Sequence, residues 1–175
     1  ANIAQLTTID GFTTGTLTYS LLDTTTNLLA NSGGYLTGSV NVTVTGTATL
    51  AQLTSMDALT TGTVSASAIA DTASNLAANA GGYITGSVSV LITDAASLAQ
   101  LATIDAFTTG TVTYSLTDTA SALAGATATV LNTAINITAT GVATVAQATI
   151  IETATNVGTT TYNISDAISA LTGAS

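Results

Sequence analysis

Lysine, arginine, histidine, proline, cysteine and tryptophan do not occur in this chain of 175 residues, and nine acidic residues give it a formal charge of −9. Nucleic acids and anionic membrane surfaces attract clustered basic side chains, so we expect neither as a partner. Without cysteine and histidine the chain has no disulfides, no thiol chemistry and none of the usual zinc or copper ligands. Serine and threonine are abundant, but no histidine or lysine can activate them, so we predict that the chain is not an enzyme.

Long apolar runs are also missing, although 46% of the residues are hydrophobic. The apolar stretches are short and are interrupted by Thr, Ser, Asn and Gly, whereas a membrane helix needs about 20 apolar residues. We therefore expect no membrane insertion. Ala1 is not followed by the basic segment and apolar core of a secretory signal. We expect the sequence to be an excerpt of a longer chain or a fibre subunit.

An internal repeat organises the whole sequence. The string AQL or AQA recurs at Ala4, Ala51, Ala99 and Ala146, in steps of 47, 48 and 47 residues. Turn residues divide each step into halves and lie at Gly15, Gly38, Gly62, Gly86, Gly110, Thr133 and Gly158. The structural repeat is therefore half of the longer step, about 24 residues, and occurs in two alternating versions.

The stretch TGTVTYSLTDTASALAG (109–125) shows the content of one repeat. Val112, Tyr114 and Leu116 alternate with polar residues, which is typical of a half-buried strand. Asp118 then precedes a short run rich in alanine and leucine, which indicates a helix start. Strands that recur at equal distances, each followed by a crossover, must run parallel.

We predict a repeat solenoid of the α/β class, with a parallel sheet on one side, short helices on the other and about 24 residues per coil. Residues 1–175 would form one continuous solenoid of about seven coils. The alternative is a right-handed parallel β-helix without helices, because Thr and Val also occur in the presumed helical segments. An extra residue before Asp71 predicts a β-bulge at the end of that strand. Neither end carries a recognisable capping repeat, so we expect self-association, either head-to-tail or lateral.

The pattern TYSLTDTASALA, with its copies SLLDTTTNLLA, SAIADTASNLAA and NISDAISALTG, covers nearly the whole chain. It resembles the degenerate repeats of very large bacterial and cyanobacterial surface or secreted proteins of the adhesin-like, beta-strand-repeat type. The resemblance implies an extracellular or cell-surface location and a structural or adhesive role, as a filament, a surface layer or an adhesin stalk. The chain lacks the GGxGxD nonapeptide of the calcium-binding secreted relatives.

Two columns of acidic residues recur with the repeat. The first acidic column consists of Asp23, Asp71, Asp94, Asp118 and Asp166, with Gly46 and Gly141 at equivalent positions. These carboxylates either cap helix starts or bind calcium between coils, and the two glycines favour the cap. The second acidic column consists of Asp10, Asp57, Asp105 and Glu152. It either lies in solvent or bridges neighbouring solenoids through a cation. We predict no other cofactor.

The outward strand face is rich in hydroxyl groups. Its candidate surface-binding residues are Thr16, Thr18, Thr43, Thr63, Thr111, Thr113 and Thr138. Threonine is a good strand former, and stacked hydroxyls satisfy one another. A regular, uncharged threonine-rich sheet also resembles the ice-binding face of some antifreeze solenoids. The alternative function is therefore an ice-binding or a glycan- or surface-binding adhesin module. Tyr35 and Tyr83 follow glycine pairs at a bend, where we expect them to be exposed.

Overall fold

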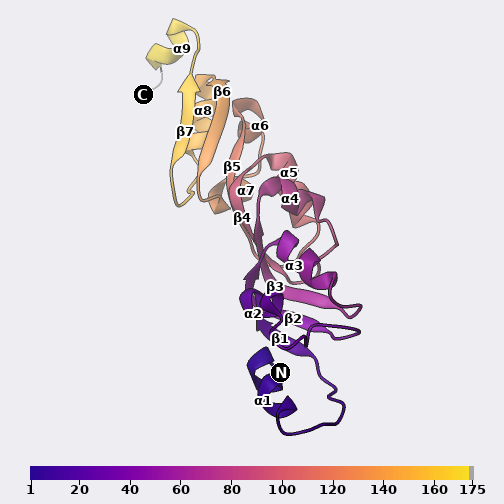
Figure 1. The fold of residues 1–175 in the computed structure, drawn as a ribbon. Coiled ribbons are helices and arrows are strands. Elements are labelled where there is room, and N and C mark those ends of the chain that lie inside the picture. Colours follow the sequence, from indigo (N-terminus) through magenta and orange to yellow (C-terminus); the bar gives the residue numbers. More distant parts are fainter. Residues whose placement is uncertain (174–175) are drawn as a thin grey trace. The chain divides into compact units, whose positions relative to one another are not determined.

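The computed structural model describes residues 1–173 and shows strands alternating with short helices (Figure 1). Two helices follow one another directly only once within this range, between β5 and β6. The elements are α1 (Ile3–Asp10), β1 (Leu21–Thr24), α2 (Thr25–Ala30), β2 (Val42–Ala48), α3 (Leu50–Asp57), β3 (Val64–Asp71), α4 (Ala73–Ala78), β4 (Ser89–Ala96), α5 (Leu98–Asp105), β5 (Val112–Thr119), α6 (Ala120–Ala124), α7 (Ala128–Thr133), β6 (Ile137–Ala143), α8 (Val145–Glu152), β7 (Thr160–Ile164) and α9 (Ile168–Gly173).

The seven strands form one parallel sheet whose spatial order is the order of the chain. Leu21 of β1 lies opposite Val42 of β2, which lies opposite Val64 of β3. Leu116 of β5 lies opposite Ile137 of β6 in the same way. A sequential parallel order follows when every strand is joined to the next by a crossover of similar length. The predicted parallel sheet with alternating helices is confirmed, and the helix-free alternative is not what the structure shows.

The recurring AQL string is explained by the way its helices begin. In α3 the Thr49 side chain accepts a hydrogen bond from the Gln52 amide, and the Gln52 side chain accepts one from the Thr49 amide. This capping box satisfies two helix-end donors reciprocally. The same box begins α1, α5 and α8, with the pairs Asn2 and Gln5, Ser97 and Gln100, and Thr144 and Gln147. Leu50, Leu53 and Met56 of α3 are buried, as their helical spacing predicts.

The strands of the second repeat version, β2, β4 and β6, contain an irregularity. Each has two alternating buried residues, then three exposed residues, then a buried alanine. Val44 pairs with Ala66 and Thr47 pairs with Ala68, so β2 spans this interval with one residue more than β3. Gly46 takes the left-handed conformation there, with φ +78°. The extra residue is therefore on β2, and the prediction that placed the bulge at the end of β3 before Asp71 is wrong in its position.

The first strand is shorter than the alternation predicts, and this expectation is corrected. Thr16 and Thr18 lie in irregular chain before β1. The segment across from them turns at Gly38, whose φ is +55°, so it offers no extended partner. Pairing begins only where the Leu21 amide donates to the Asn41 carbonyl at 2.8 Å.

The turns that precede the strands contact the previous repeat closely. Thr60 is only 7% exposed, and its Oγ1 lies 3.0 Å from the Gly38 carbonyl oxygen and 2.7 Å from that of Val40. Thr108 repeats this arrangement one long period later. A Cβ placed on Gly62 would overlap the Val40 carbonyl. The turn glycine is thus required by the distance between backbones of adjacent repeats.

The chain divides into two compact bodies. The first comprises Ala1–Asp71, Ala78–Val90 and Phe107–Thr111; the second comprises Thr72–Ala77, Leu91–Ala106 and the described residues from Val112 onward. Each has buried leucines and isoleucines of its own, and each interaction described below lies within one body. No helix in residues 1–173 has both the length and the apolar character needed to cross a bilayer.

Candidate functional site

The first acidic column connects each strand end to the helix of the preceding repeat. Each carboxylate accepts a hydrogen bond from the amide of the first residue of that helix. The pairs are Asp23 with Ile3 at 2.9 Å, Asp71 with Leu50 at 3.1 Å, Asp94 with Ala73 at 2.7 Å, Asp118 with Leu98 at 3.0 Å and Asp166 with Val145 at 3.0 Å. These amides have no partner inside their own helix. The column is therefore a series of caps that join consecutive repeats.

The second carboxylate oxygen often accepts a hydrogen bond from an amide of its own repeat. Asp118 Oδ1 accepts from the Thr119 amide at 2.8 Å, and Asp166 Oδ1 accepts from the Ala167 amide at 2.7 Å. The N-cap of the helix that follows Asp118 is Thr119 itself. The prediction that these aspartates cap helices is thus right in chemistry, but the helix that they cap belongs to the preceding repeat.

Asp23 is the most enclosed acid of the column, with 7% of its surface exposed. Desolvation raises the pKa of its carboxyl, but hydrogen bonds from the Ile3 amide, the Asn27 side chain and the Thr24 amide together lower it below the usual 3.8. The Asn27 and Thr24 bonds are each 2.8 Å long. The buried charge is held by three donors, which is what a structural carboxylate requires.

The second acidic column lies at the C-terminal ends of α1, α3, α5 and α8, and its four residues are exposed. Three members bond a tyrosine of the following repeat. The Tyr35 hydroxyl lies 3.4 Å from Asp10, and Tyr83 and Tyr162 bond Asp57 and Glu152. Desolvation by burial and the Asp57 carboxylate raise the pKa of Tyr83, and the hydrogen bond to Glu152 raises that of Tyr162.

Tyr35 corrects an expectation from the sequence. It was expected to be exposed at its bend, but it is 9% exposed, and Tyr83 is half-buried. The Tyr35 ring packs edge-on against Tyr19, with ring centroids 6.2 Å apart and an interplanar angle of 81°. A Cβ on Gly33 would overlap the Tyr35 ring. The glycine before the tyrosine therefore makes room for the ring, a signal that sequence reasoning missed.

The threonine face is present as short ladders on neighbouring strands. Thr43 lies opposite Ser65, with 3.4 Å between the hydroxyl oxygens, and Thr138 lies opposite Thr161. Thr63 receives support from Asn41, whose side-chain oxygen accepts from its amide and its hydroxyl.

Not every candidate on this face lies on a strand. Thr113 is on β5, Thr63 and Thr111 immediately precede β3 and β5, and Thr16 and Thr18 lie outside any strand. Among the candidates, Thr43 thus lies opposite a hydroxyl of β3, and Thr138 lies opposite Thr117 of β5 as well as Thr161 of β7.

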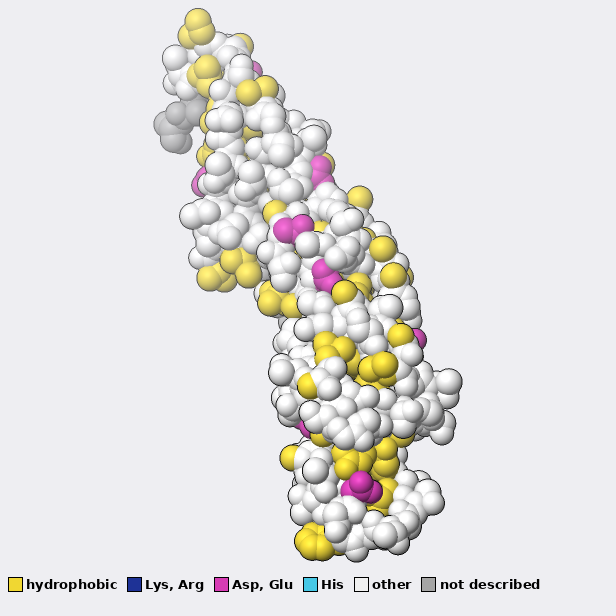
Figure 2. Space-filling view, viewed as in Figure 1, with side chains coloured by type: hydrophobic (Ala, Val, Ile, Leu, Met, Phe, Trp, Pro, Cys, Tyr) yellow, Lys and Arg dark blue, Asp and Glu magenta, His cyan; other side chains and the backbone are white. Residues whose placement is uncertain are grey.

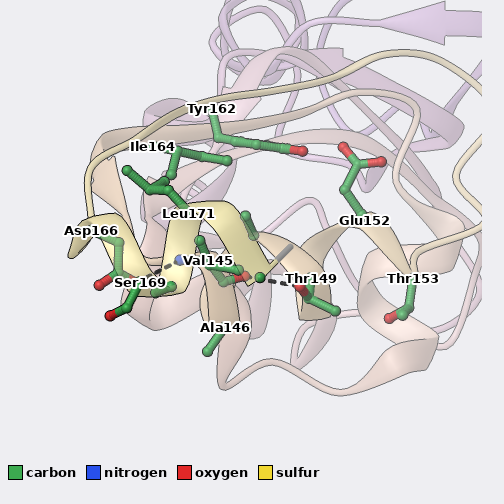
Figure 3. Close-up of a pocket in the computed structure, with 13 residues that line it drawn as sticks. Val145, Ala146, Thr149, Glu152, Thr153, Tyr162, Ile164, Asp166, Ser169 and Leu171 are labelled. Atoms are coloured by element: carbon green, nitrogen blue, oxygen red, sulfur yellow. Dashed lines mark hydrogen bonds between the residues drawn. The ribbon is translucent and has the colours of Figure 1, made fainter. Parts of the chain in front are cut away.

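A pocket of about 1100 Å³ lies between α8, β7 and α9 (Figure 3). Val145, Ile164 and Leu171 give it apolar walls. The Tyr162 hydroxyl points toward the Glu152 carboxylate in Figure 3, consistent with the hydrogen bond between them. Glu152 and Tyr162 thus bind each other, Asp166 bonds the Val145 amide, and the remaining surface is mainly apolar.

The carboxylates do not gather into one patch on the face shown in Figure 2, where they are spread among polar and apolar atoms. Among residues 1–173, no group of three or more acidic side chains lies close enough together to hold a metal ion. Calcium at the first acidic column stays a prediction. Comparison with family models, curated proteins and solved structures finds no match for this chain.

Proposed function

We propose that this chain is a segment of an extracellular α/β solenoid that serves as a structural rod, in a filament, a surface layer or an adhesin stalk. The observation that supports the proposal most strongly is the first acidic column, because its five carboxylates each bond the helix of the preceding repeat. A repeat with this chemistry is incomplete without its neighbour. Such a stack grows by adding repeats, and head-to-tail or lateral self-association extends it further.

Other polar groups support the same role. Thr60 and Thr108 use their hydroxyls on backbone carbonyls of the preceding repeat, and the capping-box glutamines bond helix ends. These are structural uses of the residue types that would otherwise be candidates for catalysis. The lack of Lys and Arg removes every cleavage site of trypsin-like proteases, which suits a material that persists outside the cell.

Electron microscopy of the purified chain, with and without a calcium chelator, tests this function. We expect elongated particles or filaments that persist in chelator, since the first-column carboxylates bond amides. Disassembly in chelator would instead support calcium between repeats. Compact particles that never associate, at any protein concentration or ionic strength, would contradict the structural role.

The second candidate function is an ice-binding or glycan-binding module that uses the threonine face. The observation in its favour is the pairing of Thr43 with Ser65 and of Thr138 with Thr161 across adjacent strands, which repeats hydroxyls at a spacing of about 4.8 Å. Thermal hysteresis of the wild type that is lost in Thr138→Lys would establish ice binding. A glycan array would detect binding to sugars, and inactivity in both assays leaves the structural role.

A further inference from the structure

A cavity of about 380 Å³ lies among α5, β5 and α7 in the second compact body. Its apolar lining includes Leu98, Leu101, Val112 and Val130, beside the ring of Tyr114. Tyr114 and Leu101 are 5% and 6% exposed, so these walls are part of the core. The Asp105 carboxylate of the second acidic column also lines the cavity. We name it the Asp105 cavity. Thr129 and Thr133 complete the lining, and Asp105 lies at its exposed side. A mainly apolar pocket of a few hundred cubic ångströms with a few polar groups is typical of a small-molecule site.

The equivalent place in two sister repeats is filled by a tyrosine of the chain itself. The equivalent position lies twelve residues after the first-column aspartate of each repeat. It is residue 35 after Asp23, residue 83 after Asp71 and residue 130 after Asp118. The first two positions are Tyr35 and Tyr83, whose hydroxyls bond Asp10 and Asp57. The third position is Val130. Asp105, the counterpart of these acids, thus faces a cavity where its sisters face a phenol.

The surroundings of the missing ring have changed with it. A Cβ on Gly33 or Gly81 would overlap the following tyrosine ring, and the counterpart of these glycines before Val130 is Ala128. Ring and glycine are therefore replaced together, and residues 128–133 form helix α7 where the sister repeats have a turn with φ +89° at Gly33 and +87° at Gly81.

The wall against which the ring would pack is retained. In the first repeat, Tyr19 packs edge-on against Tyr35 and donates its hydroxyl to the Tyr35 carbonyl at 2.9 Å. Its counterpart Tyr114 donates to the Val130 carbonyl, also at 2.9 Å. The aromatic wall and the carboxylate are thus both in place without the ring, and the Tyr114 hydroxyl also bonds Thr133 of α7.

We propose that the Asp105 cavity binds a small phenol. The ligand ring lies against Tyr114 and Leu101, and its hydroxyl donates a hydrogen bond to the Asp105 carboxylate, as Tyr35 does to Asp10. A neutral donor suits this position because the chain has no cation to attract an anionic ligand. This site is independent of the structural role proposed above.

The test is a titration with p-cresol, the tyrosine side chain as a free molecule, followed by amide chemical shifts of the full chain. We expect saturable one-to-one binding with the largest shifts around Leu101, Val112 and Val130. Toluene, which has the same ring and methyl group without the hydroxyl, is the control ligand. In Asp105→Asn, p-cresol should bind roughly five- to tenfold more weakly while toluene is unaffected, because a charge-assisted hydrogen bond becomes a neutral one.

Two further variants test the place of the ring. Val130→Phe supplies a ring from the chain and should abolish p-cresol binding. Tyr35→Val opens the corresponding room beside Asp10, where Tyr19 supplies the aromatic wall, and should create a second p-cresol site. The proposal is overturned by non-saturable binding to the wild type, by unchanged binding to a folded Val130→Phe, or by equal losses of p-cresol and toluene in Asp105→Asn. If Val130→Phe does not fold, the Asp105→Asn comparison decides alone.

Discussion

Replacing Asp118 by asparagine should open the start of α5 without unfolding the rest of that helix. Asp118 Oδ2 accepts from the Leu98 amide at 3.0 Å, and Oδ1 accepts from the Thr119 amide at 2.8 Å. Asparagine retains one acceptor oxygen, so its NH₂ group must face one of these two donors. The Thr119 contact is local, since the two residues are adjacent in the chain. We therefore expect the asparagine to keep that bond and to lose the bond to Leu98.

The size of the effect on hydrogen exchange follows from the type of hydrogen bond that is lost. A hydrogen bond to a charged group contributes about 1.5 to 3 kcal/mol. Each 1.4 kcal/mol corresponds to a factor of ten, so hydrogen exchange of the Leu98 amide should accelerate by about 10- to 150-fold. The Gln100 amide, which bonds the Ser97 side chain at 3.2 Å, is the internal reference and should change much less.

The control variant is Asp105→Asn, at the other end of the same helix. It removes the same charge, and a negative charge at a helix C-terminus is mildly unfavourable, so its loss should not accelerate exchange at Leu98. Unchanged Leu98 exchange in Asp118→Asn, or an equal acceleration in both variants, would refute the assignment of Asp118 as a cap that acts between repeats.

Three other predictions concern stability measured by urea unfolding. Hydrogen bonds hold the pKa of Asp23 below its usual 3.8. The ionised carboxylate therefore contributes fully to the free energy of unfolding above about pH 4, and this contribution is lost as the pH falls through the folded-state pKa. Asp23→Asn should lower the free energy of unfolding at about pH 6 and lower it much less near pH 2. Gly62→Ala should cost about 1 to 3 kcal/mol through backbone overlap, whereas Gly15→Ala, whose new Cβ would meet only the Thr13 hydroxyl at 3.3 Å, should be nearly neutral; equal costs would contradict the close approach of repeats. Leu76→Ala, at a fully buried position, should cost about 2 to 5 kcal/mol, and a loss under 1 kcal/mol would show that α4 is not packed as described.

The regular parts of the fold could be predicted because local pattern and tertiary role agree there. Val42 and Val44 alternate with threonines, and Leu50, Leu53 and Met56 keep helical spacing, so their burial follows from period alone. Because the strands recur at a constant distance along the chain and each is followed by a crossover, a parallel sheet could be predicted. The length of the first strand was overestimated because the alternation of apolar and polar residues does not reveal whether a partner strand lies opposite.

The connections between repeats could not be read from one repeat. An aspartate before a helical run is equally compatible with capping its own helix or a neighbouring one, and only the stacking distance places Asp118 on Leu98. The burial of Tyr35 depends on Gly33, which lies under its ring. The pattern of apolar and polar residues in the sequence does not reveal this contact. The sequence shows Val130 where two sister repeats have tyrosine, but only the folded chain places it with Asp105 and Tyr114 around one cavity.

X-ray fibre diffraction from oriented material tests the proposed stacking of repeats most directly. If each repeat adds one parallel strand along the axis of a solenoid, the strand spacing of about 4.8 Å should appear as a reflection along the fibre axis. That reflection should persist after treatment with a calcium chelator. A strand spacing found only perpendicular to the fibre axis, or no axial order in material that remains folded, would contradict the account.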